Sequence, residues 1–243
     1  LHGVLKTVVD HLAGSQLSTL VDQADTAANR WREGTNLGSK LEDLRPWGQS
    51  LPPDEAVDLV RFLGMRIDLL NLAEERQRLR VLRQRERSLH PHPLDESIAA
   101  AVAELKQRGT TDETMARIVK NLRVEFVITA HPTQAKRRTV LSKLQRIGAI
   151  LNTLEVCDTL PAERTEILAR LESEVSLLWL TEQRRTERPA VTDEVRTGLF
   201  TVDENLWTVL PRVQRELRQA LARHYPSISP PSAFVQFASW IGG

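Results

Sequence analysis

The stretch RVEFVITAHPTQAKRR at residues 123–138 decides the fold that we expect for this chain. Its run VEFVI, residues 124–128, is mostly β-branched or aromatic, is too short for an independent helix, and is soon followed by Pro132, so we predict a buried strand. His131 follows the C-terminal end of that strand. In α/β barrels and open α/β sheets, the loops that leave this end of the strands converge on the active site. His131 is therefore the first candidate catalytic residue.

A helix is expected directly after the histidine, over residues 134–154. Pro132 suits a first helical position because its missing N–H would have no partner there, and the Thr133 hydroxyl can bond to the free amides nearby. Those amides and the positive end of the helix dipole favour an anion, and the three cations at residues 136–138 add fixed positive charge. The segment thus predicts an oxyanion site beside an imidazole that titrates near neutral pH.

A second short strand is predicted by Phe234, Val235 and Phe237, after a long helical excursion. Two strands separated in this way suit the opening of a β/α barrel. We therefore expect a mostly α fold, the N-terminal part of an incomplete β/α (TIM-like) barrel with long helical insertions and about two short parallel strands. Residues 1–121 are expected to be helical, and residues 122–243 to hold the first barrel strands and their helices.

Hydrophobic periodicity predicts the longer helices. Residues 54–85 form one helix, which the HPHP linker at residues 90–93 ends, and its expected buried stripe is Ala56, Val60, Leu63, Ile67 and Leu70. Residues 95–108 form the next helix, which Gly109 ends, and Thr110 with Glu113 is expected to cap the following one.

Two more helices follow the histidine segment. One runs from Pro161 to Trp179, with a buried side at Ile167, Leu168, Leu171, Val175 and Leu178. The other begins at Thr192, and Pro211 is expected to kink or split it. Trp207 in this second helix is interpreted as a core residue, and Cys157, the only cysteine, as apolar filler that excludes an internal disulfide.

Composition narrows the function classes. The net charge of +1 creates no field that would recruit nucleic acid or a membrane, and no stretch approaches the ~20 apolar residues of a membrane span. The arginine-rich run at residues 76–87 carries interspersed glutamates and no aromatic residue, which favours a solvated helix surface over a polyanion site. The chain also lacks a basic and then apolar leader, so we expect a cytoplasmic protein.

Three motifs resemble one enzyme family. TAHPT at residues 129–133, followed by paired arginines, is similar to the signature of phosphoenolpyruvate carboxylase. LLWLTEQRRTERPAVTDEVRTGL at residues 177–199 resembles a tryptophan-containing helix end, an arginine pair and a helix start in that family. FASWIGG at residues 237–243 resembles the beginning of its SWxGGDRDGNP loop. The resemblance covers most of the chain, extending weakly upstream through residues 71–80.

The resemblance implies carboxylation of phosphoenolpyruvate with bicarbonate, giving oxaloacetate and phosphate. It gives His131 a part in the second stage, in which this residue takes the carboxyphosphate proton and helps to hold carbon dioxide. It also implies Mg²⁺ or Mn²⁺, with ligands outside this chain, and a tetramer for the complete enzyme. We expect an N-terminal piece of such an enzyme, inactive alone because the metal ligands and the phosphoenolpyruvate-binding arginines lie downstream.

A separate anion site is implied by the same resemblance. It places Arg137, Arg138 and one residue of the pair Arg184 and Arg185 in a pocket for sugar-phosphate activators, and the spacing from the histidine selects Arg185, with Arg184 as the alternative. Guanidinium groups suit phosphate because they donate two parallel hydrogen bonds and keep their charge.

Two other functions stay open at this point. The chain could be a non-catalytic helical regulatory or assembly module that binds a sugar phosphate through its arginines. Alternatively, His131 could be a phosphohistidine carrier, with the arginines neutralising the phosphoryl group.

Overall fold

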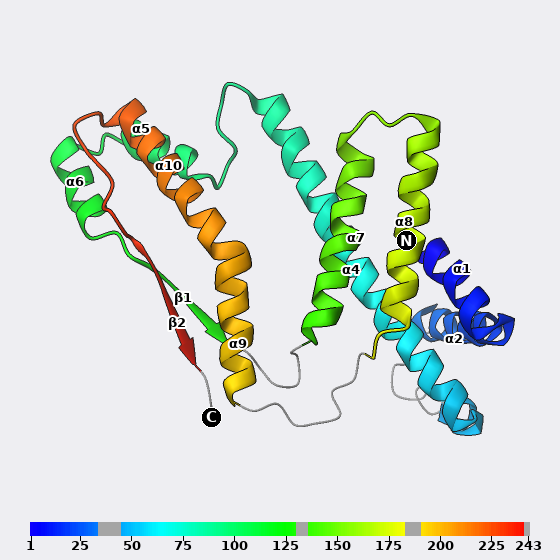
Figure 1. Ribbon diagram of the computed structural model, residues 1–243. Helices are drawn as coiled ribbons and strands as arrows, with labels where there is room; N and C mark the ends of the chain where they lie inside the picture. The colour runs from blue at the N-terminus through cyan, green and yellow to red at the C-terminus, as the bar shows by residue number, and fades with distance from the viewer. Residues whose placement is uncertain (34–44, 130–135, 183–190, 241–243) are drawn as a thin grey trace. The chain divides into compact units, whose positions relative to one another are not determined.

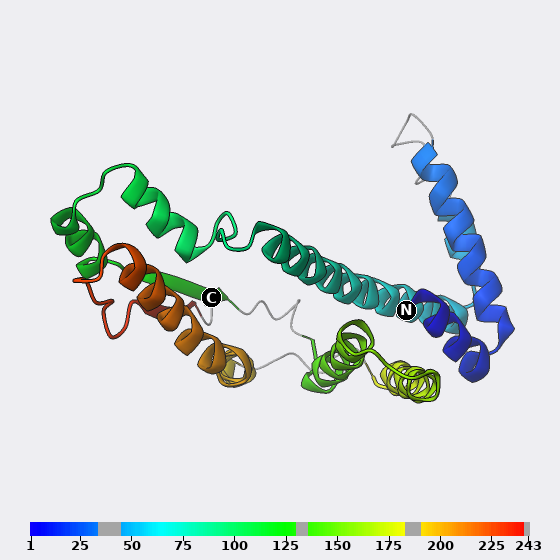
Figure 2. The ribbon, with the colours of Figure 1, turned by 90° about the horizontal axis from the view of Figure 1, so that it is seen from above.

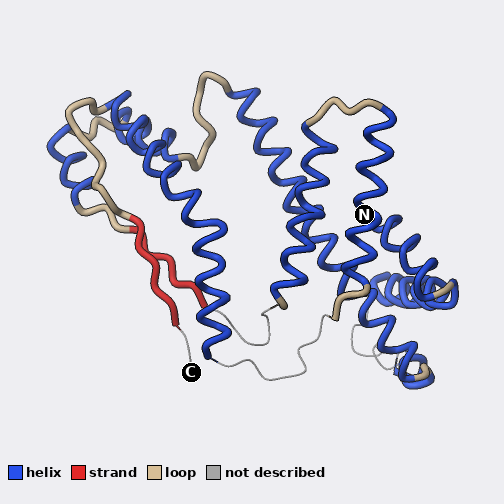
Figure 3. Tube along the Cα trace, in the orientation of Figure 1, coloured by secondary structure: helices blue, strands red, loops and turns tan. Residues whose placement is uncertain are grey.

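The computed structural model describes residues 1–33, 45–129, 136–182 and 191–240. These residues are mostly helical, with two short strands (Figure 3). They form two compact units: unit 1 is Leu1–Leu79 with Lys136–Arg184, and unit 2 is Arg80–Ala135 with Arg185–Gly243. Both units are discontinuous in sequence. The sequence-based division between residues 121 and 122 concerns a larger barrel, and it stays a prediction.

Unit 1 contains two helical hairpins and most of one long helix. The hairpins are α1 (His2–Ala13) with α2 (Ser15–Glu33), and α7 (Arg138–Val156) with α8 (Pro161–Trp179), which lie side by side in Figure 1. Helix α4 (Pro53–Leu89) is a continuous helix, as Figure 2 shows, and ends just before the HPHP segment as predicted. The core of unit 1 is built from buried aliphatic and aromatic side chains of all five helices: Leu5, Val8, Val9, Leu17, Leu20, Val21, Leu59, Phe62, Met65, Leu69, Val140, Ile147, Ile150, Leu171, Val175, Leu178 and Trp179.

The buried stripe of α4 differs from the predicted one. Leu59, Phe62, Met65 and Leu69 are buried, whereas three members of the predicted stripe are exposed: Val60, Ile67 and Leu70. Apolar residues occupy so many positions of this segment that the periodicity is compatible with two adjacent stripes. The observed stripe includes Phe62, the largest apolar side chain of this segment, whose burial removes a large apolar area from water.

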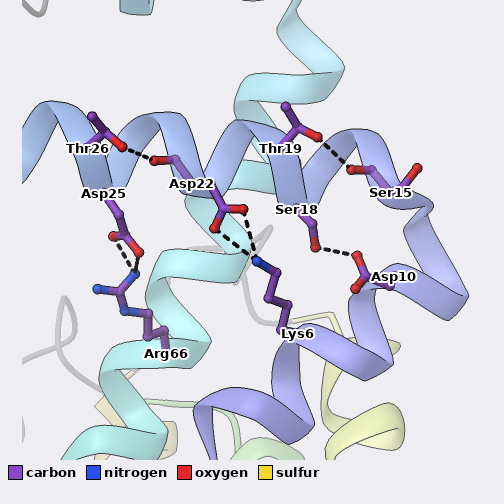
Figure 4. Close-up of polar contacts among 9 residues, drawn as sticks. All are labelled: Lys6, Asp10, Ser15, Ser18, Thr19, Asp22, Asp25, Thr26 and Arg66. Atoms are coloured by element: carbon purple, nitrogen blue, oxygen red, sulfur yellow. Dashed lines mark hydrogen bonds and ion pairs between the residues drawn. The ribbon is translucent and has the colours of Figure 1, made fainter.

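Polar contacts tie α2 to both of its neighbours in unit 1 (Figure 4). Lys6 of α1 donates to both carboxylate oxygens of Asp22 at 3.0 Å. Arg66 of α4 donates through Nη1 to both oxygens of Asp25, at 2.6 and 2.8 Å. About one third or less of the Arg66 and Asp25 side chains is exposed, so this pair is less screened by water than a typical surface ion pair.

After the end of α4, unit 2 contains α5 (Ile98–Gln107) and α6 (Asp112–Lys120). Ser97 caps α5 by accepting from the amide of Ala100, and Gly109 adopts φ 80° in the turn that follows. The predicted capping box is displaced by one residue. Thr111, not Thr110, caps α6, because its hydroxyl accepts from the Thr114 amide at 3.2 Å.

The helix predicted from Thr192 is not split at Pro211, and its change of helix type comes earlier, at a π-helical turn. This segment consists of α9 (Val191–Thr201), the π-helical turn η1 (Val202–Leu206) and α10 (Trp207–His224), which contains the proline. Proline cannot donate to the carbonyl four residues before it, which here belongs to Trp207, directly after the π turn. The core prediction for Trp207 was wrong, because 74% of this residue is exposed.

The core of unit 2 is smaller than that of unit 1. Tyr225 is fully buried at the end of α10, and its hydroxyl donates to the Thr110 carbonyl at 3.2 Å, while Lys106 of α5 lies 4.4 Å from its ring centroid. The other buried members of this core are Val102, Met115, Val119, Leu217, Ala220, Leu221 and Phe234.

The two predicted strands are present and pair in parallel. Strand β1 (Val124–Thr129) lies beside β2 (Val235–Trp240), with Val124 opposite Val235 and Thr129 opposite Trp240 (Figure 1). Phe126 and Phe237 stack with ring centroids 5.9 Å apart. The prediction of a mostly helical chain with two short parallel strands is confirmed.

Candidate functional site

The residues predicted to act in the site are only partly described. Arg137 and Arg138 lie in the described part of the chain. His131, Arg184 and Arg185 lie outside it, so their expected roles stay predictions. Strand β1 ends at Thr129, two residues before the histidine in sequence.

The helix after the histidine segment begins later than predicted. Helix α7 starts at Arg138, not at residue 134, and Arg137 precedes it with an extended backbone, φ −63° and ψ 141°. Consecutive cations are unfavourable near the positive end of a helix dipole, and Lys136 and Arg137 find partners elsewhere. Pro132 and Thr133, expected to start the helix, lie outside the described residues. Lys136 and Arg137 therefore precede α7, and Arg138 is its first residue. None of these three cations lies in the second turn of the helix.

Lys136 is paired with a carboxylate of α4. Its ammonium donates to the carboxylate of Asp68, whose side chain is only 13% exposed to solvent. A carboxylate that is largely removed from water needs a compensating charge, and Lys136 provides it. Within unit 1, this pair attaches Lys136, the first described residue after His131, to α4.

Arg137 contacts the chain just beyond α8. Its Nη1 donates to the carbonyl oxygen of Glu182 at 3.1 Å. Arg61 of α4 donates through Nη2 to the neighbouring carbonyl, that of Thr181, at 3.4 Å. Backbone carbonyls outside regular structure need such partners, and here two guanidinium groups satisfy consecutive ones. Arg137 is thus held at Glu182, which precedes the Arg184 and Arg185 pair in sequence.

Arg61 makes a second contact at the same place. Its guanidinium carbon lies 5.2 Å from the ring centroid of Trp179, which is only 4% exposed and ends α8. This cation–π contact orients Arg61 toward the end of α8.

Sequence reasoning missed both α4 residues, Arg61 and Asp68. Both residues are charged and lie beside apolar positions of α4, a pattern that could have marked them as candidates. The wrong choice of buried stripe prevented this pattern from being recognised. With Leu59, Phe62, Met65 and Leu69 as the stripe, Asp68 flanks the core and Arg61 lies next to Phe62. A charged residue at such a boundary needs a partner from a neighbouring element.

A separate concavity of about 290 Å³ lies between α7 and α8. Arg146, Arg170 and Glu174 line it, together with apolar and hydroxyl side chains, and Arg146 pairs with Glu174 at 3.4 Å. Neither Arg137 nor Arg138, the predicted site residues that the structure describes, lines this concavity.

Comparison with known proteins decides the family. A family model described as phosphoenolpyruvate carboxylase matches residues 1–243. The chain belongs to the phosphoenolpyruvate carboxylase family. Similar proteins named phosphoenolpyruvate carboxylase occur in Rhodothermus marinus, with 32% identity over all of this chain, in Roseiflexus castenholzii, with 34% over all of it, and in Methylorubrum extorquens, with 36% over 84% of it. The chain spans about a quarter of the length of these relatives: 26%, 26% and 23% of them.

The described residues of this family member contain neither a metal-ligand cluster nor a membrane-spanning helix. Among them, no group of three or more His, Cys, Asp or Glu side chains could hold a metal ion. Across the same residues, no helix is both long enough and apolar enough to cross a membrane.

Cys157, expected as apolar filler, is instead exposed at the end of α7. The helix stops there because its backbone turns to an extended conformation.

Proposed function

We propose that residues 1–243 belong to an enzyme that joins bicarbonate to phosphoenolpyruvate, giving oxaloacetate and inorganic phosphate. The observation that carries this proposal is the family match over residues 1–243, which includes the TAHPT segment, whose first residue is the last residue of β1. In this proposal the chain supplies the catalytic histidine and part of a phosphate site, is inactive alone, and acts as part of a cytoplasmic homotetramer.

A β/α barrel completed by strands outside residues 1–243 is the fold part of the proposal. The parallel pairing of β1 with β2 supports it, because parallel sheets are normally covered on both faces. On β1, however, Phe126 and Val127 are 53% and 59% exposed, more than a covered strand would leave. Further strands and helices of a barrel would cover them.

The proposed reaction has two stages. First, a bicarbonate oxygen attacks the phosphorus of phosphoenolpyruvate, which breaks its bond to the enol oxygen and gives carboxyphosphate and the pyruvate enolate. Carboxyphosphate then loses its proton and separates into carbon dioxide and phosphate, and the enolate carbon attacks the carbon dioxide. His131 accepts the carboxyphosphate proton and helps to hold carbon dioxide, which requires a neutral imidazole before the transfer.

A divalent metal ion, Mg²⁺ or Mn²⁺, is part of this proposal but is not assigned to residues of this chain. The described residues contain no suitable ligand group, so they do not fit such an ion. We place its ligands outside residues 1–243.

The arginines are proposed to bind the phosphate of a sugar-phosphate activator and to take no part in turnover. The contact of Arg137 with the Glu182 carbonyl supports this grouping, because Arg185 follows Glu182 by three residues and an extended chain covers no more than about 3.6 Å per residue. Arg138 begins α7 beside it. Arg185, with Arg184 as the alternative, completes the proposed site.

The activity itself is tested with the whole protein. Incubation with phosphoenolpyruvate, bicarbonate and Mg²⁺ is expected to produce oxaloacetate and phosphate in equal amounts, and omission of bicarbonate is expected to stop oxaloacetate formation. Oxaloacetate is measured by its reduction with malate dehydrogenase. If oxaloacetate does not form under any of these conditions, the carboxylase proposal is wrong.

Substitution of Arg137 tests the proposed activator site. We expect Arg137→Gln to weaken binding of glucose 6-phosphate about tenfold, because a bidentate charge-assisted contact is lost, while kcat without the activator stays within about twofold. Arg123→Gln is the matched control, since Arg123 is also exposed but is not one of the residues proposed to form the site. Equal binding by the Arg137 variant and the unsubstituted protein would remove this residue from the site.

A further inference from the structure

Two charged residues on α4 contact residues that shortly precede the proposed phosphate-binding arginines in sequence. Asp68 accepts a hydrogen bond from Lys136, and Arg61 donates to the carbonyl of Thr181. The two residues are seven positions apart, close to two helical turns, so they lie on the same side of α4. One helix face therefore holds two segments that are far apart in sequence.

Arg137 lies between these two attachments. Its neighbour Lys136 is tied to Asp68, and its own guanidinium is tied to Glu182, the residue after Thr181. Arg137 is the N-cap of α7, and its carbonyl accepts from the amides of Val140 and Leu141 at 2.9 and 3.1 Å, so the helix holds its backbone on one side. The pair of Lys136 with Asp68 holds the preceding residue, and the contact with Glu182 sets the direction of the guanidinium.

The burial of Asp68 makes its pair with Lys136 stronger than an ordinary surface contact. The side chain of Asp68 is 13% exposed and that of Lys136 is 40% exposed. Exposed ion pairs contribute little to structure, but a largely buried carboxylate strongly favours a conformation in which its cation stays in place. Lys136 is therefore held, and the backbone of Arg137 with it.

The guanidinium of Arg137 keeps donors available for a ligand. It has five N–H groups, and one of them, on Nη1, donates to the Glu182 carbonyl. Bidentate recognition of phosphate depends strongly on the direction of the guanidinium plane. A residue that fixes this plane would change phosphate affinity without touching the phosphate.

We propose that Asp68 is a positioning residue for the phosphate-binding arginines, acting through Lys136 on Arg137. This inference rests on the proposed function of Arg137. Asp68 orients the guanidinium before the ligand arrives, so that less conformational freedom is lost on binding. It makes no contact with the sugar phosphate and takes no part in the carboxylation steps.

The test uses Asp68→Asn in the whole protein, with glucose 6-phosphate as the probe. The amide is nearly the same size as the carboxylate but carries no charge. We expect the dissociation constant for glucose 6-phosphate, measured by calorimetry, and the concentration for half-maximal activation to rise about three- to tenfold, as for coupled residues in one network. The kcat without activator should stay within about twofold of the unsubstituted value.

Two control variants separate positioning from a general structural effect. Asp68→Glu keeps the charge and is expected to recover most of the affinity. Glu75→Gln removes an exposed carboxylate from the same helix and is expected to change nothing. If Asp68→Asn does not fold, as judged by circular dichroism, Lys136→Gln breaks the same pair from its exposed side and should give the same weakening.

The outcomes distinguish this inference from the proposal beneath it. If the unsubstituted protein does not bind glucose 6-phosphate, the proposed activator site is wrong, and the positioning role fails with it. If it binds and Asp68→Asn or Lys136→Gln binds equally well, only the positioning role is overturned. A parallel loss of kcat and of affinity in a folded variant would also overturn it, because that pattern indicates a general structural role.

Discussion

Replacement of His131 by Ala in the whole protein is expected to lower the rate of oxaloacetate formation by about 10²- to 10⁴-fold, the usual contribution of a general base. The reason lies in the second stage of the proposed reaction. Without the imidazole, carboxyphosphate keeps its proton, and carbon dioxide is neither released nor held efficiently near the enolate. The rate is measured by coupling oxaloacetate to malate dehydrogenase, with circular dichroism to confirm that the variant folds.

The two-stage chemistry adds a sharper readout for this variant. The first stage does not use His131, so the variant is expected still to form carboxyphosphate and the enolate. Water then hydrolyses carboxyphosphate to bicarbonate and phosphate, and the enolate takes up a proton to give pyruvate, so phosphate is released in excess of oxaloacetate when bicarbonate is present. His131→Asn, which keeps a planar side chain of similar size, should behave in the same way. Unchanged oxaloacetate formation in both variants would favour the helical regulatory or assembly module. Acid-labile phosphate on His131 after incubation with labelled phosphoenolpyruvate would favour the phosphohistidine carrier.

Phe62→Ala is expected to give the largest loss of stability in unit 1, about 3–5 kcal/mol of unfolding free energy. Phe62 is fully buried on α4 and also packs edge-on against the ring of His2, with centroids 6.4 Å apart. Truncation removes its apolar area and leaves a cavity that the surrounding helices fill only in part. Urea denaturation followed by circular dichroism measures the change.

Val60→Ala is the matched control for Phe62→Ala. Val60 lies on the same helix, but it is 59% exposed, so the change in unfolding free energy should stay within about 0.5 kcal/mol. The pair of variants also decides between the two possible buried stripes of α4. A large loss for Val60→Ala with a small loss for Phe62→Ala would support the stripe predicted from the sequence and contradict the structure.

The success of the sequence predictions depended on how unambiguous each pattern was. The run at residues 124–128 and the residues around Val235 have few alternatives as strands, and both strands formed. Helix α8 has a proline at its start and forms as Pro161–Trp179, with Leu171, Val175 and Leu178 buried as predicted, although Leu168 is exposed.

The wrong predictions have local physical causes. In α4 the apolar residues are so dense that two stripes were compatible with the sequence, and only packing against other helices selects one. The start of α7 was misplaced because the partners of Lys136 and Arg137, Asp68 and Glu182, are distant in sequence. Local propensity contains no information about such long-range pairs, which is also why Asp68 was not recognised.

The contact between Arg61 and Trp179 gives the molecule an internal optical reporter. Indole fluorescence responds to nearby charge and to water, and Trp179 is shielded from solvent while Arg61 lies over its ring. Because the same guanidinium holds the Thr181 carbonyl, a ligand that displaces this stretch is expected to alter the emission of Trp179. Trp207, largely exposed in unit 2, provides a water-facing reference signal within the same chain.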